Sequence, residues 1–305
     1  MDNKYKFPTI LHANNLYVKR ERGELYFSTH CQTYNERHNS VKKLITMTCA
    51  QRDVQSDFPL IRFCLCDKPT HKVSEDGMRG SITMEDGTVV PVESVPMYTV
   101  STETSEYANT YPDAFFLNWP PAVIDYEHNR IELMSAGLKA PHTNALGWLG
   151  SVNADIRRRF VEIANSVSKD KIYYRSITWD PESRNCSDLI PPKFMSLKDQ
   201  VLRFKYLIDM RGQGYSARTK IMFFCRRPIF LVDTPFKEFF YEYLEPWKHY
   251  VPVKRDLSDL VENIDRLESD RTLYKDLVEN AWEFGQDHLT RASAFDRYAL
   301  ILNKH

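Results

Sequence analysis

Short apolar runs that alternate with helical segments constrain the second half of this chain more than any other feature. Short apolar runs, mostly of aliphatic and aromatic residues, lie at 145–149, 204–208 and 228–232, and helical patterns follow at 154–166 and 216–225. Apolar runs of this length, bounded by turn residues, are typical of buried strands. Because strands that alternate with helices form a parallel sheet with both faces covered, the sequence predicts an α/β fold.

The first half of the chain predicts a separate unit. The apolar run 60–66 is typical of a buried strand, and 95–100 predicts another, which Pro96 confines to a sheet edge or to the first position of the strand. A chain of 305 residues is long enough for two domains of roughly 100–200 residues each. We therefore predict an N-terminal domain at 1–138, a second domain at 139–275, and C-terminal helices at 276–305 that pack back on both.

Composition and charge argue against several classes of protein. Lysine plus arginine number 41, as do aspartate plus glutamate, and this balance argues against a protein that coats nucleic acid. No run approaches the ~18–20 apolar residues of a membrane span, and the N-terminal residues lack the apolar core of a secretion signal. We expect a cytoplasmic protein whose six cysteines are free thiols, or one whose targeting segment is missing from this sequence.

The strongest local signal is a glycine-containing turn between the predicted strand 204–208 and the helix after it. The segment 211–214 has the sequence Arg-Gly-Gln-Gly, in which the glycines allow the backbone to approach a ligand closely. The helix N-terminus that follows offers unpaired N–H groups, and Arg218 adds a forked positive charge that suits a diphosphate. An ordinary strand-to-helix turn with a solvated arginine explains the same residues equally well.

A weaker instance of the same pattern occurs at Gly150 and Ser151, with Arg157 further along the next predicted helix. Taken alone, this turn is better explained as an ordinary connection. Two such turns at the same end of one parallel sheet would border one ligand crevice, so each supports the other.

Asp67 follows the predicted strand 60–66 and precedes Pro69 by two residues. A carboxylate at the carboxyl end of a strand faces the usual ligand crevice of an α/β sheet, where it can act as a general base. Without further support, a turn-forming role is the simpler explanation.

Several common catalytic motifs are absent from the sequence. The segment 214–218 lacks the second glycine of a nucleophile elbow, and there is neither a Walker A sequence nor a strict D-x-D pair for a metal-bound nucleotide. Cys64, Cys66 and His71 do not have the usual spacing of zinc ligands. We therefore expect neither a metal nor another cofactor.

A set of motifs downstream of residue 205 resembles a known family. In chain order the motifs are KYLIDMRG at 205–212, SAR at 216–218, FFY at 239–241, EPWKHYVPV at 245–253 and DL at 256–257. Their combination resembles the capsule-associated-protein family, glycosyltransferase family 90, which includes the protein O-glucosyltransferases and the fungal capsule xylosyltransferases. Upstream segments at 63–69, 104–107, 121–123 and 149–151 are similar to that family as well, although Leu149 stands where the family has arginine.

The resemblance implies a GT-B fold, with two Rossmann-like lobes, an interlobe cleft and C-terminal helices. The N-terminal lobe would bind the acceptor and the C-terminal lobe a UDP-sugar, without a metal. Transfer would invert the anomeric carbon and leave a β-linkage, with Asp67 deprotonating the acceptor hydroxyl. The residues expected at the donor are Ser151, Arg157, Gly212, Gln213, Gly214, Tyr215, Ser216, Ala217, Arg218, Val253, Asp256 and Leu257, and those expected at the acceptor or transferred sugar are Glu106, Tyr107, Ala122 and Val123.

Within the family, the compact chain without a secretion signal or ER-retention tail is more similar to the xylosyltransferases, including those that large algal viruses encode, than to the animal O-glucosyltransferases. We therefore expect UDP-xylose as the donor in preference to UDP-glucose, and a glycan as the acceptor. Transfer of glucose or xylose to a serine side chain of a protein is the alternative. A second alternative is a non-catalytic protein that binds a carbohydrate or a nucleotide sugar; it is disfavoured because Asp67, Arg157 and Arg218 are all present.

Overall fold

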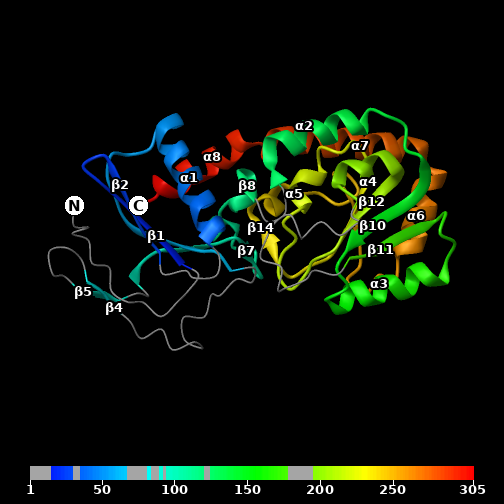
Figure 1. Cartoon of the computed structure of the whole chain (residues 1–305), viewed down its shortest axis with the longest axis horizontal. Helices are drawn as coiled ribbons and strands as arrows, with labels where there is room; N and C mark the ends of the chain where they lie inside the picture. Colours follow the sequence, from blue (N-terminus) through cyan, green and yellow to red (C-terminus); the bar gives the residue numbers. More distant parts are fainter. Residues whose placement is uncertain are drawn as a thin grey trace. The chain divides into compact units, whose positions relative to one another are not determined.

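A computed structural model describes residues 15–29, 35–66, 81–83, 89–91, 94–119, 124–177 and 195–305 (Figure 1). The chain divides into two compact units. Unit 1 consists of Met1–Ala114, Lys237–Phe239 and Ala294–His305, and unit 2 of Phe115–Phe236 and Phe240–Ser293. The division into two units agrees with the GT-B class that the resemblance implied.

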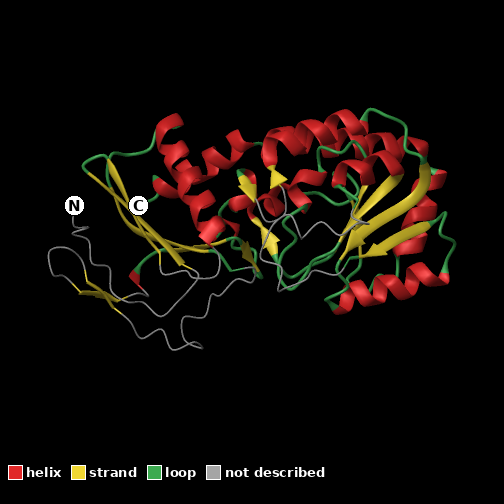
Figure 2. Ribbon diagram, in the orientation of Figure 1, coloured by secondary structure: helices red, strands yellow, loops and turns green. Residues whose placement is uncertain are grey.

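Unit 2 is built on a five-stranded sheet in which every paired neighbour is parallel, drawn in yellow at the right of Figure 2. Its order is β11-β10-β12-β13-β15. The strands are β10 (Thr143–Gly150), β11 (Ile172–Ser176), β12 (Phe204–Asp209), β13 (Ile229–Val232) and β15 (Val251–Val253). The predicted α/β class is confirmed, and Pro252 lies in an edge strand, where its missing N–H costs no ladder hydrogen bond.

The helices of unit 2 lie between and after these strands. They are α2 (Tyr126–Gly137), α3 (Asp155–Ser166), α4 (Leu197–Arg203), α5 (Thr219–Met222), α6 (Leu260–Ser269) and α7 (Arg271–His288), and α8 (Arg291–Leu302) continues from unit 2 into unit 1. A short antiparallel pair, β8 (Asn118–Trp119) with β9 (Ile124–Asp125), precedes α2. None of the helices in the described part of the chain is long and apolar enough to cross a membrane.

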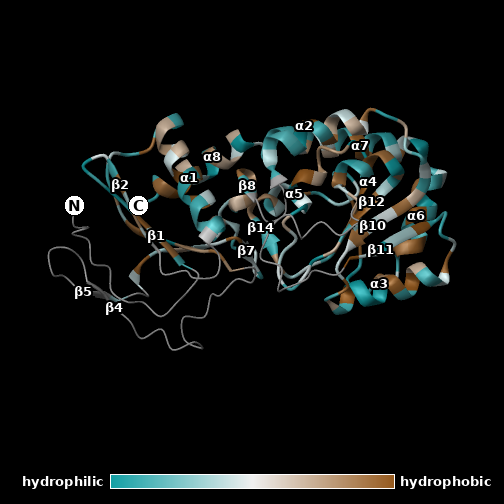
Figure 3. Ribbon diagram, viewed as in Figure 1, coloured by the Kyte–Doolittle hydropathy of each residue, from teal (hydrophilic) through white to brown (hydrophobic). Residues whose placement is uncertain are grey.

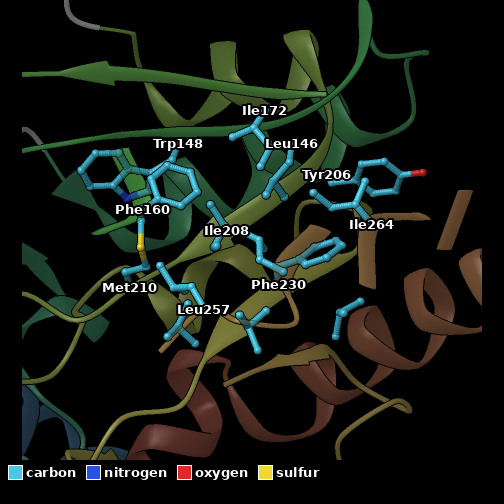
Figure 4. Close-up of a cluster of buried hydrophobic side chains, with 14 of the residues drawn as sticks. Leu146, Trp148, Phe160, Ile172, Tyr206, Ile208, Met210, Phe230, Leu257 and Ile264 are labelled. Carbon is cyan, nitrogen blue, oxygen red and sulfur yellow. The ribbon is translucent and has the colours of Figure 1, made fainter. Parts of the chain in front are cut away.

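One apolar cluster covers a face of the sheet with residues from α3, α6 and α7 (Figure 4). In it, Trp148 of β10 contacts Phe160 of α3 edge to face, with ring centroids 5.6 Å apart. Helix α3 is amphipathic, and its alternating polar and apolar residues appear as teal and brown stretches in Figure 3. The strand residues that alternate with the cluster, such as Leu207 and Leu231, are buried too, so both faces of the sheet are covered.

The order of the strands creates a switch point between β10 and β12. From β10 the chain runs through α3 to β11 on one side, then returns to β12 on the other side of β10 and continues outward to β13 and β15. The connections that leave β10 and β12 therefore diverge. In open parallel sheets, ligands bind at the carboxyl ends of the strands at such a point.

Unit 1 contains a mixed sheet of order β2-β1-β3-β6. Strand β1 (Asn15–Glu21) is antiparallel to β2 (Glu24–Thr29) and to β3 (Phe58–Cys64), whereas β3 is parallel to β6 (Met97–Thr99). The edge position of β6, directly after Pro96, confirms the expectation from that proline. Unit 1 also contains α1 (Asn35–Gln51), the pair β4 (Ser81–Thr83) and β5 (Val89–Pro91), and the pair β7 (Ser101–Thr102) and β14 (Lys237–Glu238).

The boundaries of the compact units differ from the predicted ones at 138 and 276. Unit 2 begins at Phe115, so α2 belongs to it, and the chain from Ala294 onward belongs to unit 1. The reason is packing: α2 lies against α4 and α5 of unit 2, whereas Tyr298 of α8 donates a hydrogen bond to the Pro112 carbonyl of unit 1 at 2.6 Å. Sequence periodicity says that a segment is helical but not which core it joins.

One predicted helix is much shorter than expected. The helix expected over 216–225 is only the single turn α5. Further along the chain, α6 begins at Leu260, and Leu257 before it has a left-handed backbone with φ of 60°, which ends the preceding turn before a helix can form. The side chain of Asp259 accepts from the Lys254 N–H and does not cap the helix.

Gly147 provides a test of the sheet packing. A Cβ atom at this position in β10 would overlap the buried ring of Phe204, whereas one at Gly212 would lie 3.5 Å from Arg157 Nη2, an ordinary contact. We expect Gly147→Ala to lower the free energy of unfolding by about 1–3 kcal/mol, because overpacking forces the neighbouring ring to move. Gly212→Ala should change it by less than about 0.5 kcal/mol. Urea unfolding of the two variants measures the difference, and equal midpoints would contradict the described packing.

Candidate functional site

The carboxyl ends of β10 and β12 bring together most of the residues predicted to bind the donor. Ser151 follows β10 directly, and the segment 210–218 connects β12 with α5. Because the two strands are hydrogen-bonded neighbours, both connections leave the same edge of the sheet. We call the residues 149–157 and 209–219 at this edge the switch-point site.

A buried carboxylate, Asp209, lies at the centre of the switch-point site. It is the last residue of β12 and only 1% exposed. Its Oδ1 accepts hydrogen bonds from Ser216 Oγ at 3.0 Å and from Arg218 Nε at 2.8 Å, and its Oδ2 accepts one from Thr219 Oγ1. These bonds fold the connection back onto the end of the strand, which explains why α5 begins only at Thr219.

Arg218 ties the two strand ends together. Besides the ion pair with Asp209, its Nη1 donates to the Leu149 carbonyl at 2.9 Å and its Nη2 to the Ile208 carbonyl at 3.3 Å. These bonds use three of the five N–H groups of the guanidinium, and a quarter of the side chain is exposed. Arg218 can therefore donate to a ligand while it stays anchored.

Arg157 connects the same two loops through their backbone. Its guanidinium donates to the carbonyls of Ser151 at 2.9 Å, Met210 at 3.1 Å and Arg211 at 3.0 Å. Burial, followed by the charge of Arg218, lowers the pKa of Arg157 to about 10, so the side chain stays cationic at neutral pH. A fourth bond, from its Nη1 to Asn153 Oδ1 at 3.4 Å, leaves one of its five N–H groups over, which makes Arg157 chiefly a brace between the loops.

The charges at the switch-point site do not balance. Arg157, Arg211 and Arg218 contribute three positive charges, whereas Asp209 and Asp155 supply two negative charges. Asp155 pairs with Arg158 on the exposed face of α3, so Asp209 is the carboxylate that faces these arginines. Arg211 Nη1 donates to the carbonyl of the next residue, Gly212, at 3.0 Å and lies over the Phe236 ring. Positive charges that repel one another are stabilised when an anion binds between or beside them, and a diphosphate has the charge and the acceptors for this.

The remaining predicted residues of the 210–218 connection have structural partners. Gln213 is exposed, and its Nε2 donates to the Asn153 carbonyl at 2.8 Å, which links the connection to the loop after β10. Gly214 and Tyr215 are buried, and Lys220 Nζ lies 5.3 Å from the Tyr215 ring centroid and donates to the Ala217 carbonyl at 3.0 Å. The connection is thus fixed from both sides.

A second group of predicted donor residues lies at the carboxyl end of β15. Val253 is buried as the last residue of that strand, and Leu257 is buried in the left-handed turn after it. Asp256 is exposed, and the backbone N–H of Ser258 lowers its carboxyl pKa below the usual value. Because β13 lies between β12 and β15, this group shares a sheet edge with the switch-point site but is separated from it by one strand.

The residues predicted at the acceptor or the transferred sugar fall outside unit 2 or outside the described residues. Glu106 and Tyr107 belong to unit 1, where Glu106 precedes a single 3₁₀ turn, Tyr107–Asn109. The Tyr107 carbonyl accepts hydrogen bonds from Thr110 and Arg297. Asp67, Ala122 and Val123 lie outside the described residues, so their predicted roles stay predictions.

Three residues of the site, Asp209, Thr219 and Asn153, had no predicted role. The signal for Asp209 was present in the sequence: an aspartate at the end of an apolar strand, one residue before an arginine–glycine turn, is either a ligand group or a turn anchor. Among the described residues, no cluster of three or more histidine, cysteine, aspartate or glutamate side chains is arranged to hold a metal ion. Metal independence of the reaction stays a prediction.

Comparisons with known proteins agree on one family. The family model of Glycosyl transferase family 90 matches residues 15–305. The chain is similar to protein O-glucosyltransferase 1 of Rattus norvegicus, with 38% identity over 87 residues that make up 28% of this chain and 22% of the rat protein. It is also similar to the O-glucosyltransferase rumi homolog of Anopheles gambiae, with 26% identity over 227 residues, or 70% of this chain and 56% of that protein. The matches span less than two thirds of the length of either relative.

Similarity to solved structures is weaker. The chain matches the C-terminal domain of a glycosyl transferase group 1 family protein from Francisella tularensis with a TM-score of 0.36 and 9% identity, over 58% of this chain and 96% of that one.

The bracing role of Arg157 has a testable consequence for stability. Arg157→Ala leaves the carbonyls of Met210 and Arg211 without their charged donor, and we expect the free energy of unfolding to fall by about 2 kcal/mol. The neighbouring Arg158 pairs with Asp155 on the exposed face of α3, so Arg158→Ala should cost less than about 0.5 kcal/mol. Chemical denaturation of both variants checks this, and equal losses would argue against the brace.

Proposed function

Because this chain belongs to glycosyl transferase family 90, we propose that it transfers a sugar from a UDP-sugar to a hydroxyl group of a glycan acceptor. The observation that most supports this proposal is the excess of arginine charge at the switch point of the parallel sheet in unit 2, where Arg218 has N–H groups left over for a ligand. In this proposal the switch-point site binds the diphosphate of the donor.

The reaction requires charge stabilisation on the leaving group. The oxygen of the acceptor hydroxyl forms a bond with the anomeric carbon, its proton passes to a general base, and the bond from the anomeric carbon to the diphosphate oxygen breaks, so that UDP leaves with the electron pair. Negative charge therefore grows on the diphosphate in the transition state. Fixed arginine donors oriented before the reaction stabilise such charge most effectively, because they need no reorganisation.

We further propose that the transfer inverts the anomeric carbon and needs no metal. The arginines of the switch-point site would then perform the electrostatic work that a divalent cation performs in other nucleotide-sugar enzymes. Asp67 is the proposed base, on the strength of the motif that ends in Asp67-Lys68-Pro69. A single in-line displacement by the acceptor oxygen leaves the product with a β-linkage when the donor is α-linked.

UDP-xylose is the proposed donor, and UDP-glucose is the second candidate. The resemblance of the motifs at 205–257 to a family that includes xylosyltransferases supports the first, whereas the names of the curated relatives, O-glucosyltransferases, favour the second. The same names make a serine side chain of a protein the second candidate for the acceptor. Glucose has a hydroxymethyl group at C5 that xylose lacks, so residues that contact this group would discriminate between the two donors.

A donor panel tests the proposed function. Purified protein is incubated with UDP-xylose, UDP-glucose, UDP-galactose and GDP-mannose, each with and without EDTA, and release of the nucleotide diphosphate is measured. We expect turnover of UDP-xylose, and more slowly of UDP-glucose, that EDTA does not change. Strict dependence on manganese or magnesium would contradict the metal-free mechanism, and binding of UDP-sugars without any turnover would favour the non-catalytic alternative.

The proposed base gives a separate prediction. Asp67→Asn keeps the shape of the side chain but cannot accept the proton, so transfer should fall at least ~10²-fold while the affinity for UDP changes little. Asp57→Asn, the same change at an exposed aspartate just before β3, is the matched control. If transfer by Asp67→Asn stays near that of the control variant, Asp67 is a turn residue and another group is the base.

A further inference from the structure

The carboxylate of Asp209 is shielded from solvent and has no part in the proposed reaction so far. At 1% exposure, a charged carboxylate is costly unless it is paired and hydrogen-bonded. Asp209 meets both conditions, because Arg218 supplies the opposite charge and Ser216 and Thr219 supply hydroxyl donors. The chain therefore maintains a buried ion pair at the very edge of the sheet where the proposed donor binds.

The geometry of that pair constrains the guanidinium of Arg218. Asp209 holds Nε, while the carbonyls of Leu149 and Ile208 hold Nη1 and Nη2. With acceptors on all three nitrogens, the plane of the guanidinium is fixed by the protein alone. The N–H groups left over then point in a direction that is set before any ligand arrives.

Two explanations for Asp209 predict opposite effects of removing its charge. If the carboxylate only offsets excess positive charge, its removal leaves the arginines less neutralised and an anion should bind more tightly. If the carboxylate orients Arg218, its removal frees the guanidinium and an anion should bind more weakly, because part of the binding energy must then order the side chain.

We propose that Asp209 is a positioning residue that orients the Arg218 guanidinium toward the diphosphate of the donor. This inference rests on the proposed function, since it takes the ligand of Arg218 to be a nucleoside diphosphate. Ser216 and Thr219 act with Asp209 by closing the connection from β12 to α5 over the carboxylate.

A double-mutant cycle with UDP as the probe tests the inference. UDP affinity is measured by calorimetry for the full-length wild type, Asp209→Asn, Arg218→Ala and the double variant. We expect Asp209→Asn to weaken UDP binding about tenfold, Arg218→Ala about tenfold to a hundredfold, and the double variant no more than Arg218→Ala alone. Asp265→Asn, which removes an exposed carboxylate of α6 that pairs with Lys171, is the control and should bind UDP like the wild type.

Each outcome decides between the explanations. Unchanged or tighter UDP binding by Asp209→Asn would overturn the positioning role, and losses that add in the double variant would show that Asp209 acts on the fold and not through Arg218. If Asp209→Asn does not fold, Arg218→Lys serves instead: it keeps the charge but loses the fork, and wild-type affinity in that variant would overturn the inference. Failure of the wild type to bind UDP would instead overturn the proposed function.

Discussion

The pairing of β10 with β12 is the constraint on which the rest of the site depends. These strands are neighbours in space although β11 and α4 lie between them in the chain, and the connections that leave their carboxyl ends diverge. Strands of a sheet stand about 4.8 Å apart, so residues that follow the two strands come within side-chain reach of each other. Arg218 and Arg157 then bridge the gap with hydrogen bonds to backbone carbonyls on both sides.

Backbone carbonyls explain why arginine fills both bridging positions. A guanidinium presents five N–H groups in a rigid plane, so one side chain can satisfy carbonyls at the ends of two strands at once. Lysine would supply the charge but could not hold that geometry. The arrangement has a structural cost, because burial and then the charge of Arg218 lower the pKa of Arg157. The buried Asp209 offsets part of the repulsion between the two arginines. A site whose own charges repel in this way favours an anionic ligand.

The sequence predicted the elements of unit 2 better than their limits. The strands near 204–208 and 228–232 and the helix near 154–166 are present within a few residues, because buried apolar runs and an amphipathic repeat are local properties. The helix expected at 216–225 begins only at Thr219, because Ser216 and Arg218 bind Asp209 at the end of the preceding strand. The hydrophobic periodicity of the sequence cannot show that a tertiary hydrogen bond will override a local helical pattern.

The amino-acid sequence alone predicts the α/β class, the turns after β10 and β12, and the arginines that follow them. Each of these depends on residues that are close together in the chain. Three features needed the folded chain: that α2 joins unit 2, that β15 stands one strand away from β12, and that the donors of Arg157 are largely used by the backbone. The physical reason is that strand pairing determines which side chains can contact each other. Strand pairing is a long-range property that depends on burial and on the direction of the connections.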